Sequence, residues 1–271
     1  MTTAPGNRVG GGPTARIRLD IAYDGTGFSG WAAQPGRRTV AGVLTEALAA
    51  VFGEDGPRGL TVAGRTDAGV HASGQVCHVD VPVAAAEALT DSLVRRLAGL
   101  LSADVRVRAV SRVPPTFDAR FSALSRRYEY RVTDTPWGAE PLRRYETLAW
   151  PRPLNLDAIN AAARALRGEH DFVAYCRRKA HGTTIRSVSR LDWQRRPDGV
   201  VLATVEADAF CQAMVRSLVG ALLAVGEGRR PVDWPASLLT RNERACEVMV
   251  VPPHGLTLVA VAYPTDEVGY A

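Results

Sequence analysis

Hydrophobic and polar residues alternate along several short segments of the chain, and this two-residue period predicts β-strands. Residues 15–23 place Ile17, Leu19 and Ile21 on one face and charged side chains on the other. Such a pattern is typical of a strand with one buried face. Further strands are predicted over residues 60–64, 74–81, 104–110, 126–132, 187–194, 200–208 and 256–263.

Elsewhere apolar residues recur every three or four positions, which is the spacing of an amphipathic helix. Thr39 precedes one such segment as a candidate N-cap, and Gly168 follows another as a candidate C-cap. The predicted helices cover residues 39–52, 90–101, 157–167 and 211–225, and Gly226 ends the last of them.

Hairpin signals such as Arg-Pro-Asp-Gly outnumber strand–helix–strand alternations in this chain. We therefore predict an α+β protein in which helices pack on one face of a mostly antiparallel sheet. Prolines cluster and the periodicity lapses around residues 133–155, which indicates a boundary there. The expected organisation is a flexible lead-in over residues 1–14, a first subdomain over residues 15–135 and a second over residues 136–271.

Charge suits a polyanionic partner without requiring one. Lys plus Arg number 33 against 28 for Asp plus Glu, which gives a net charge of +5 and a pI near 9.3. Lysine occurs only at Lys179, so arginine supplies almost all of the positive charge. The planar guanidinium binds phosphate well and stacks on bases, although a GC-rich genome produces the same bias.

The sequence lacks the signals of several classes of protein. The four cysteines (Cys77, Cys176, Cys211 and Cys246) include no Cys-x-x-Cys pair, so neither a disulfide framework nor a zinc site is predicted and a reducing cytoplasm is expected. No apolar run is long enough for a membrane span, and no signal-peptide core is present. No Gly-x-Gly-x-x-Gly lies between a strand and a helix, so we predict no nucleotide cofactor.

A Gly-bounded loop between two predicted strands places Arg65 close to Asp67. Gly64 and Gly69 allow a ligand to approach the backbone, and Arg65 could keep the carboxylate ionised and oriented. An aspartate can also simply cap its own turn, which is the ordinary explanation for an isolated Asp-Ala-Gly.

Three other regions favour a functional role for this loop. In residues 117–131 arginines interleave with aromatic residues, a pattern that can bind phosphates and stack on bases. Arg216 interrupts the apolar face of a predicted helix, where it either reaches solvent or needs an anion. Prolines and a glycine bend the chain in "VVPPHG", just before the final strand.

The segment "GRTDAGVHASGQV" resembles the signature of the tRNA pseudouridine synthase A family, and the resemblance extends over most of the chain. It includes "YDGTGFSGW", "RTVAGVLTEAL", "FDARFSALSRRYEYRV", "GEHDFVAY", "TTIRSV", "FCQAMVRSLVGAL" and "PPHGLTLV". By these matches Asp67 resembles the catalytic aspartate and Arg216 the arginine that forms a salt bridge with it. Tyr128 resembles the tyrosine that packs on the target base, and Arg65 the arginine that helps to admit the flipped nucleotide.

The resemblance implies a fold, an activity and partners. The fold would be α+β: two similar subdomains that share a continuous, mostly antiparallel sheet, with a basic cleft between them, assembled as a homodimer. The activity would be isomerisation of uridine to pseudouridine in the anticodon stem-loop of tRNA, at tRNA positions 38 to 40. The reaction needs no redox change, in keeping with a chain for which no cofactor is expected.

Arginines that flank the presumed cleft are expected to contact the phosphates of the RNA. The candidates are Arg126, Arg127, Arg177, Arg178 and Arg186. The carboxylate would start cleavage of the glycosidic bond as nucleophile or as base, and the residues do not distinguish these routes. Either route needs an ionised Asp67 in a closed pocket, together with a target base removed from its stack.

Two alternatives remain open at the level of sequence. One is a metal-dependent hydrolase that uses Asp67, His71, His78 and Asp80, since these residue types are metal ligands and share one short segment. The other is a basic RNA-binding module without chemistry, which would explain the arginines and aromatic residues but not Asp67 or Arg216.

Overall fold

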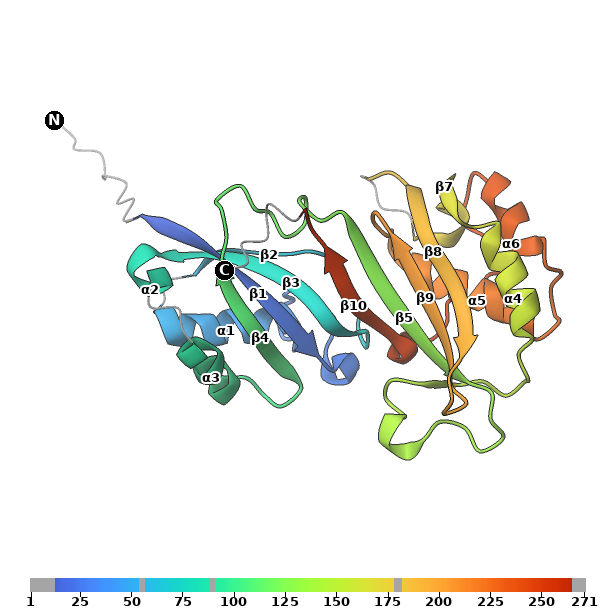
Figure 1. Ribbon diagram of the computed structural model, residues 1–271, viewed down its shortest axis with the longest axis horizontal. Coiled ribbons are helices and arrows are strands. Elements are labelled where there is room, and N and C mark those ends of the chain that lie inside the picture. The colour runs from blue at the N-terminus through green and yellow to red at the C-terminus, as the bar shows by residue number, and fades with distance from the viewer. Residues whose placement is uncertain (1–12, 54–56, 88–90, 178–181, 265–271) are drawn as a thin grey trace.

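A ten-stranded mixed β-sheet runs through the length of the computed structural model, which describes residues 13–53, 57–87, 91–177 and 182–264 (Figure 1). Its strands are β1 (Thr14–Tyr23), β2 (Arg58–Val62), β3 (His71–Pro82), β4 (Val105–Arg112), β5 (Ser125–Thr133), β6 (Leu148–Ala149), β7 (Gly168–Asp171), β8 (Ile185–Arg195), β9 (Val201–Ala207) and β10 (Leu256–Ala262).

The order of strands in the sheet is β4-β1-β3-β10-β5-β9-β8-β7, with β2 paired to β3 and β6 paired to β5. Neighbouring strands are antiparallel except for the pairs β3–β10 and β5–β6. The predicted α+β class with a mostly antiparallel sheet is therefore confirmed.

Helices cover both halves of this sheet. They are α1 (Val40–Phe52), α2 (Val83–Glu87), α3 (Asp91–Leu100), α4 (Leu156–Arg164), α5 (Met214–Gly226) and α6 (Trp234–Ser237). Short 3-10 turns lie at Gly25–Gly27, Pro141–Arg143, Val173–Tyr175, Leu238–Thr240 and Pro253–Gly255. Figure 1 places α1 and α3 with β1, β3 and β4, and α4 and α5 with β8 and β9.

Most elements begin and end near the predicted positions. Ile17, Leu19 and Ile21 are completely buried, as their alternation predicts. Thr39 caps α1, because its hydroxyl accepts a hydrogen bond from the Gly42 amide at 3.2 Å.

Two helix ends were predicted wrongly, and two short strands, β6 and β7, were not predicted at all. Helix α4 ends at Arg164 with Ala165 as its cap, and Gly168 instead begins β7 in a left-handed conformation, at φ 98°. Helix α5 begins at Met214, three residues later than expected, because Ala213 takes a positive φ of 66° that is incompatible with a helix.

The last strand of the chain joins the two halves of the sheet. β10 lies between β3 and β5, parallel to the first and antiparallel to the second. The backbones approach so closely at Gly74 that a Cβ there would lie 2.1 Å from the Val259 carbonyl oxygen. Since β5 pairs with both β10 and β9, one sheet crosses the expected boundary, and the division at residue 135 stays a prediction.

No helix in the described part of the chain has both the length and the apolar character that crossing a membrane requires.

We expect Gly74→Ala to destabilise the protein by about 1–3 kcal/mol, because the added methyl group must push β10 away from β3. Gly99→Ala is the matched control, since nothing lies within 4 Å of a Cβ at this exposed position of α3. It should instead stabilise by about 0.5–1 kcal/mol. Urea unfolding of the two variants measures both effects. Equal stabilities would contradict the close contact between β3 and β10 at Gly74.

Candidate functional site

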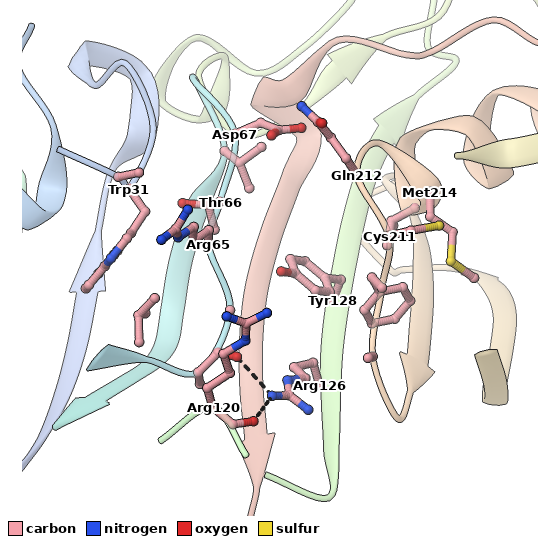
Figure 2. Close-up of a pocket in the computed structure, with 18 of the residues that line it drawn as sticks. Trp31, Arg65, Thr66, Asp67, Arg120, Arg126, Tyr128, Cys211, Gln212 and Met214 are labelled. Carbon is pink, nitrogen blue, oxygen red and sulfur yellow. Dashed lines mark hydrogen bonds between the residues drawn. The ribbon is translucent and has the colours of Figure 1, made fainter. Parts of the chain in front are cut away.

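A pocket of about 980 Å³ opens where the two halves of the sheet meet (Figure 2). Its walls come from distant parts of the sequence: Trp31 and α1, the loop over residues 64–70, Tyr128 of β5, and the start of α5 with Arg216. α1 and α5 therefore stand on the same side of the sheet. A pocket of this size can enclose a molecule as large as a nucleotide.

The loop over residues 64–70, which we call the Asp67 loop, is clamped by the segment that precedes α1. The Trp31 amide donates to the Thr66 carbonyl at 3.0 Å, and the Gly69 amide donates to the Phe28 carbonyl at 3.3 Å. A Cβ on Gly30, at φ 94°, would lie 2.9 Å from the Thr66 carbonyl oxygen. Glycine is thus required where the two loops touch.

Asp67 and Arg216 meet across the pocket, as the sequence indicated. Arg216 Nη1 lies 3.9 Å from Asp67 Oδ2, and the two side chains are 19% and 39% exposed. Burial lowers the pKa of the Arg216 guanidinium, while the carboxylate of Asp67 opposes that shift. The contact pairs a partly desolvated cation with the carboxylate of the Asp67 loop.

The bend in "VVPPHG" supports both partners of this pair. Arg216 Nε donates to the Val251 carbonyl at 2.6 Å, which orients the guanidinium. The Tyr130 hydroxyl donates to the Pro252 carbonyl at 2.7 Å. A Cβ on Gly69, at φ 78°, would lie 2.8 Å from the Pro253 ring, so this segment also packs closely against the Asp67 loop.

Arg65 does not hold the carboxylate, and on this point the expectation was wrong. Arg65 is exposed and forms no ion pair within 4 Å in the described part of the chain. In Figure 2 its side chain lies on the Trp31 side of the pocket, away from the Asp67 carboxylate. The sequence carried no signal that would reveal the direction of the Arg65 side chain.

Gln212 is a pocket residue that sequence analysis did not identify. Its exposed side chain lines the same pocket as Asp67, and both are labelled in Figure 2. The next residue, Ala213, is the only non-glycine residue with positive φ in the described ranges. A strained residue beside a pocket is a common mark of function, yet alanine carries no sequence signal for such a conformation.

Tyr128 stands in the wall of the pocket, with only 8% of the residue exposed. Its ring packs edge-on against Phe210, with centroids 5.3 Å apart. Burial raises the pKa of the Tyr128 phenol, so the ring stays neutral and can present a flat surface to a planar ligand.

Arg126 has a structural role rather than an exposed position for phosphate. Its two terminal nitrogens donate to four backbone carbonyls, those of Ala63, Arg120, Ala123 and Asp208, and burial lowers its pKa. Part of this network appears in Figure 2. Contrary to the expectation, Arg126 is therefore not available to bind a phosphate, because its guanidinium already donates to these four carbonyls.

The other arginines of the expected set lie in different places. Arg127 does not line the pocket, since side chains alternate along β5 and Tyr128 takes the pocket face. Arg186 lines the pocket and donates to the Thr183 carbonyl at 2.7 Å. Arg177 is exposed and its backbone amide donates to the Gln212 carbonyl at 2.9 Å, whereas Arg178 falls outside the described residues.

The four residues of the metal-hydrolase alternative do not converge. His71 Nδ1 accepts from the Gly25 amide, and His78 Nδ1 accepts from the Ala119 amide. Asp80 is bound by Arg16 at 2.8 and 2.9 Å. In the described ranges no three His, Cys, Asp or Glu side chains are grouped to hold a metal ion, so this alternative is wrong.

Cys176 and Cys211 form a disulfide, with Cα atoms 5.7 Å apart, whereas no disulfide was expected. The two cysteines are 35 residues apart in sequence, and only the β8–β9 hairpin between them brings their segments together. Cys77 is buried and free, and Cys246 is exposed and free.

Comparison with known proteins identifies what the chain resembles. A family model described as tRNA pseudouridine synthase matches residues 162–264. The chain is 61% identical to the tRNA pseudouridine synthase A of Frankia casuarinae, over 93% of this chain and 90% of the relative. It is 56% identical to the Streptomyces griseus protein of that name, over 93% and 89%, and 50% identical to that of Mycobacterium leprae, over 93% and 91%.

Among solved structures the chain is similar to one described as a Cbf5-Nop10-Gar1 complex. The match covers 76% of this chain and 45% of the other, at 12% identity and a TM-score of 0.35. A score this low carries no argument about fold or function, and the comparison rests on the sequence relatives.

Proposed function

The chain belongs to the tRNA pseudouridine synthase A family and isomerises uridine to pseudouridine in tRNA, and we propose that Asp67 initiates this reaction in the pocket of Figure 2. The observation that carries the proposal is the placement of Asp67, on a clamped loop and 3.9 Å from the guanidinium of Arg216. In this pocket the carboxylate has a cationic partner and remains open enough to meet a ligand.

The bond changes of the isomerisation give Asp67 and Arg216 their proposed roles. The bond from ribose C1′ to uracil N1 breaks, and a bond from C1′ to uracil C5 replaces it, while the proton on C5 is lost and N1 gains one. An ionised carboxylate can start the cleavage as nucleophile or as base. Arg216 places a positive charge 3.9 Å from this carboxylate, in a pocket from which a bound base would exclude water.

Tyr128 and Arg65 complete the proposed site. The neutral ring of Tyr128 would pack against the flipped uracil and offset part of the unstacking cost, which is roughly a few kcal/mol. Arg65 is exposed at the pocket on the Trp31 side, where it could contact the backbone of the entering nucleotide. We assign it to admission of the nucleotide, without a part in orienting Asp67.

The proposed substrate region is the anticodon stem-loop, with Arg186, Arg177 and Arg178 as phosphate contacts. Arg186 lines the pocket and Arg177 is exposed beside its Gln212 wall, which supports two of these three assignments. A substrate of this kind also favours the cytoplasm as the place of action. No cofactor enters the proposal.

Asp67→Asn should abolish turnover while leaving the fold and the tRNA affinity nearly unchanged. The amide keeps the shape of the side chain but removes the charge, so the single-turnover rate should fall at least about 100- to 10,000-fold. Asp104→Asn is the control, because Asp104 is also ion-paired, with Arg38 at 2.8 Å, but lies outside the pocket. Pseudouridine formation at near wild-type rate by Asp67→Asn would end the assignment.

Arg186→Met should weaken tRNA binding and make it less dependent on salt. Loss of one phosphate contact reduces the slope of log affinity against log salt by about 1. Arg127→Met is the matched control on the opposite face of β5, and its slope should stay at the wild-type value. Filter binding at several salt concentrations gives both slopes, and identical slopes for the two variants would remove Arg186 from the interface.

We propose that the protein acts as a homodimer through an exposed patch at residues 137–146. Trp137, Leu142 and Tyr145 are 77%, 93% and 49% exposed. Large apolar side chains that are exposed together in one segment usually mark an interface. The same segment carries two glutamates and two arginines. A surface with both signs of charge can pair with a copy of itself about a two-fold axis.

Leu142→Asp should convert the dimer into a monomer, because it places a charge at the centre of the apolar patch. Leu100→Asp is the control, at an isolated exposed leucine of α3. Sedimentation at several protein concentrations distinguishes the two masses. A wild-type protein that is monomeric, or a Leu142→Asp variant that stays dimeric, would contradict this choice of surface.

A further inference from the structure

We propose that Tyr23 and Gln75 are positioning residues for the reaction, which hold the Asp67 loop through Thr66 and Gly64 so that Asp67 points into the pocket. This inference rests on the proposed role of Asp67. Neither residue was singled out by sequence analysis, and both lie beneath the loop rather than in contact with the pocket.

A buried chain of hydrogen bonds joins the sheet to the loop. The Tyr23 hydroxyl, at the end of β1, lies 2.8 Å from Thr66 Oγ1. Gln75 Nε2, from β3, donates to the Gly64 carbonyl at 2.8 Å and to the Tyr23 hydroxyl at 3.2 Å. Gln75 is completely buried, and Tyr23 and Thr66 are only 5% and 7% exposed.

The direction of this chain follows from its donors and acceptors. The Gly64 carbonyl can only accept, and the Val76 amide donates to Gln75 Oε1 at 3.2 Å, so the orientation of the Gln75 amide is determined. Its second N–H donates to the Tyr23 oxygen, which leaves the phenol proton for Thr66. Burial raises the pKa of Tyr23 to about 12, so the phenol keeps that proton at neutral pH.

The attachment at Thr66 decides where its neighbours point. Thr66 is buried and turns its hydroxyl toward the sheet, while Arg65 and Asp67 on either side are exposed or half-exposed at the pocket. The Trp31 amide holds the Thr66 carbonyl at the same point. With Gly64 and Thr66 both bound from below, the loop cannot rotate Asp67 away from Arg216 without breaking buried hydrogen bonds.

A purely stabilising role would not need polar groups here. Apolar side chains of similar shape could fill this part of the core, whereas a buried polar group is costly unless every partner is in place. What the chain of hydrogen bonds adds is direction, since it fixes the loop at two backbone positions. A displacement of about 1 Å at a reacting group can lower a rate about 100-fold.

Tyr23→Phe tests the inference, because it removes one oxygen atom and leaves the ring in place. Tyr175→Phe is the matched control: Tyr175 is completely buried and donates to the Pro235 carbonyl at 2.6 Å, away from the pocket. Both variants should lower Tm by about 2–4 °C. Only Tyr23→Phe should also lower the single-turnover rate, by about 10- to 100-fold, with an unchanged Kd for tRNA.

Substitutions at Thr66 separate position from packing. Thr66→Ser keeps the hydroxyl and should keep nearly the wild-type rate, whereas Thr66→Val keeps the branched shape and should lose as much rate as Tyr23→Phe. Combining Tyr23→Phe with Thr66→Val should add no further loss. A wild-type rate in Tyr23→Phe, or equal losses in Thr66→Ser and Thr66→Val, would overturn the inference.

Asp67→Asn distinguishes this failure from failure of the proposed function. If Asp67→Asn is inactive while Tyr23→Phe is fully active, Asp67 keeps its role and the positioning role is lost. If Asp67→Asn remains active, both assignments fall together.

Discussion

The position of β10 between β3 and β5 is the constraint on which the rest of the structure depends. This strand pairs with the strand that follows the Asp67 loop and with the strand that carries Tyr128. Because the pairing makes one sheet from two halves, residues from both halves face one pocket. Gly74 permits this arrangement, since any side chain there would collide with the β10 backbone.

The segment that leads into β10 also fixes residues of the pocket. The bend before β10 supports Arg216 through the Val251 carbonyl and contacts Gly69 of the Asp67 loop through Pro253. From the other side, the segment around Gly30 and Trp31 holds the Thr66 carbonyl. The proposed catalytic carboxylate therefore stands on a loop that is fixed on several sides. An active site held by rigid surroundings can keep reacting groups aligned without movement during the reaction.

A few chemical groups in the pocket suit the reaction of the family. For an isomerisation that exchanges one glycosidic bond for another, the pocket offers a carboxylate in Asp67, a cation 3.9 Å from it in Arg216 and an aromatic surface in Tyr128. Arginines divide between two tasks. Arg126 is used inside the protein to bind four carbonyls, whereas Arg177 is exposed and the half-buried Arg186 lines the pocket.

The sequence by itself determined the local elements and the identity of the central residues. Alternation at Ile17, Leu19 and Ile21 and the cap at Thr39 depend on neighbours in the chain, so they could be read directly. Asp67, Arg216 and Tyr128 were found through motifs. Only the tertiary structure decided which arginines face the pocket, that Cys176 meets Cys211, and that Tyr23 and Gln75 reach the Asp67 loop. Such contacts join residues far apart in sequence, and periodicity carries no information about which distant segment will lie beside them.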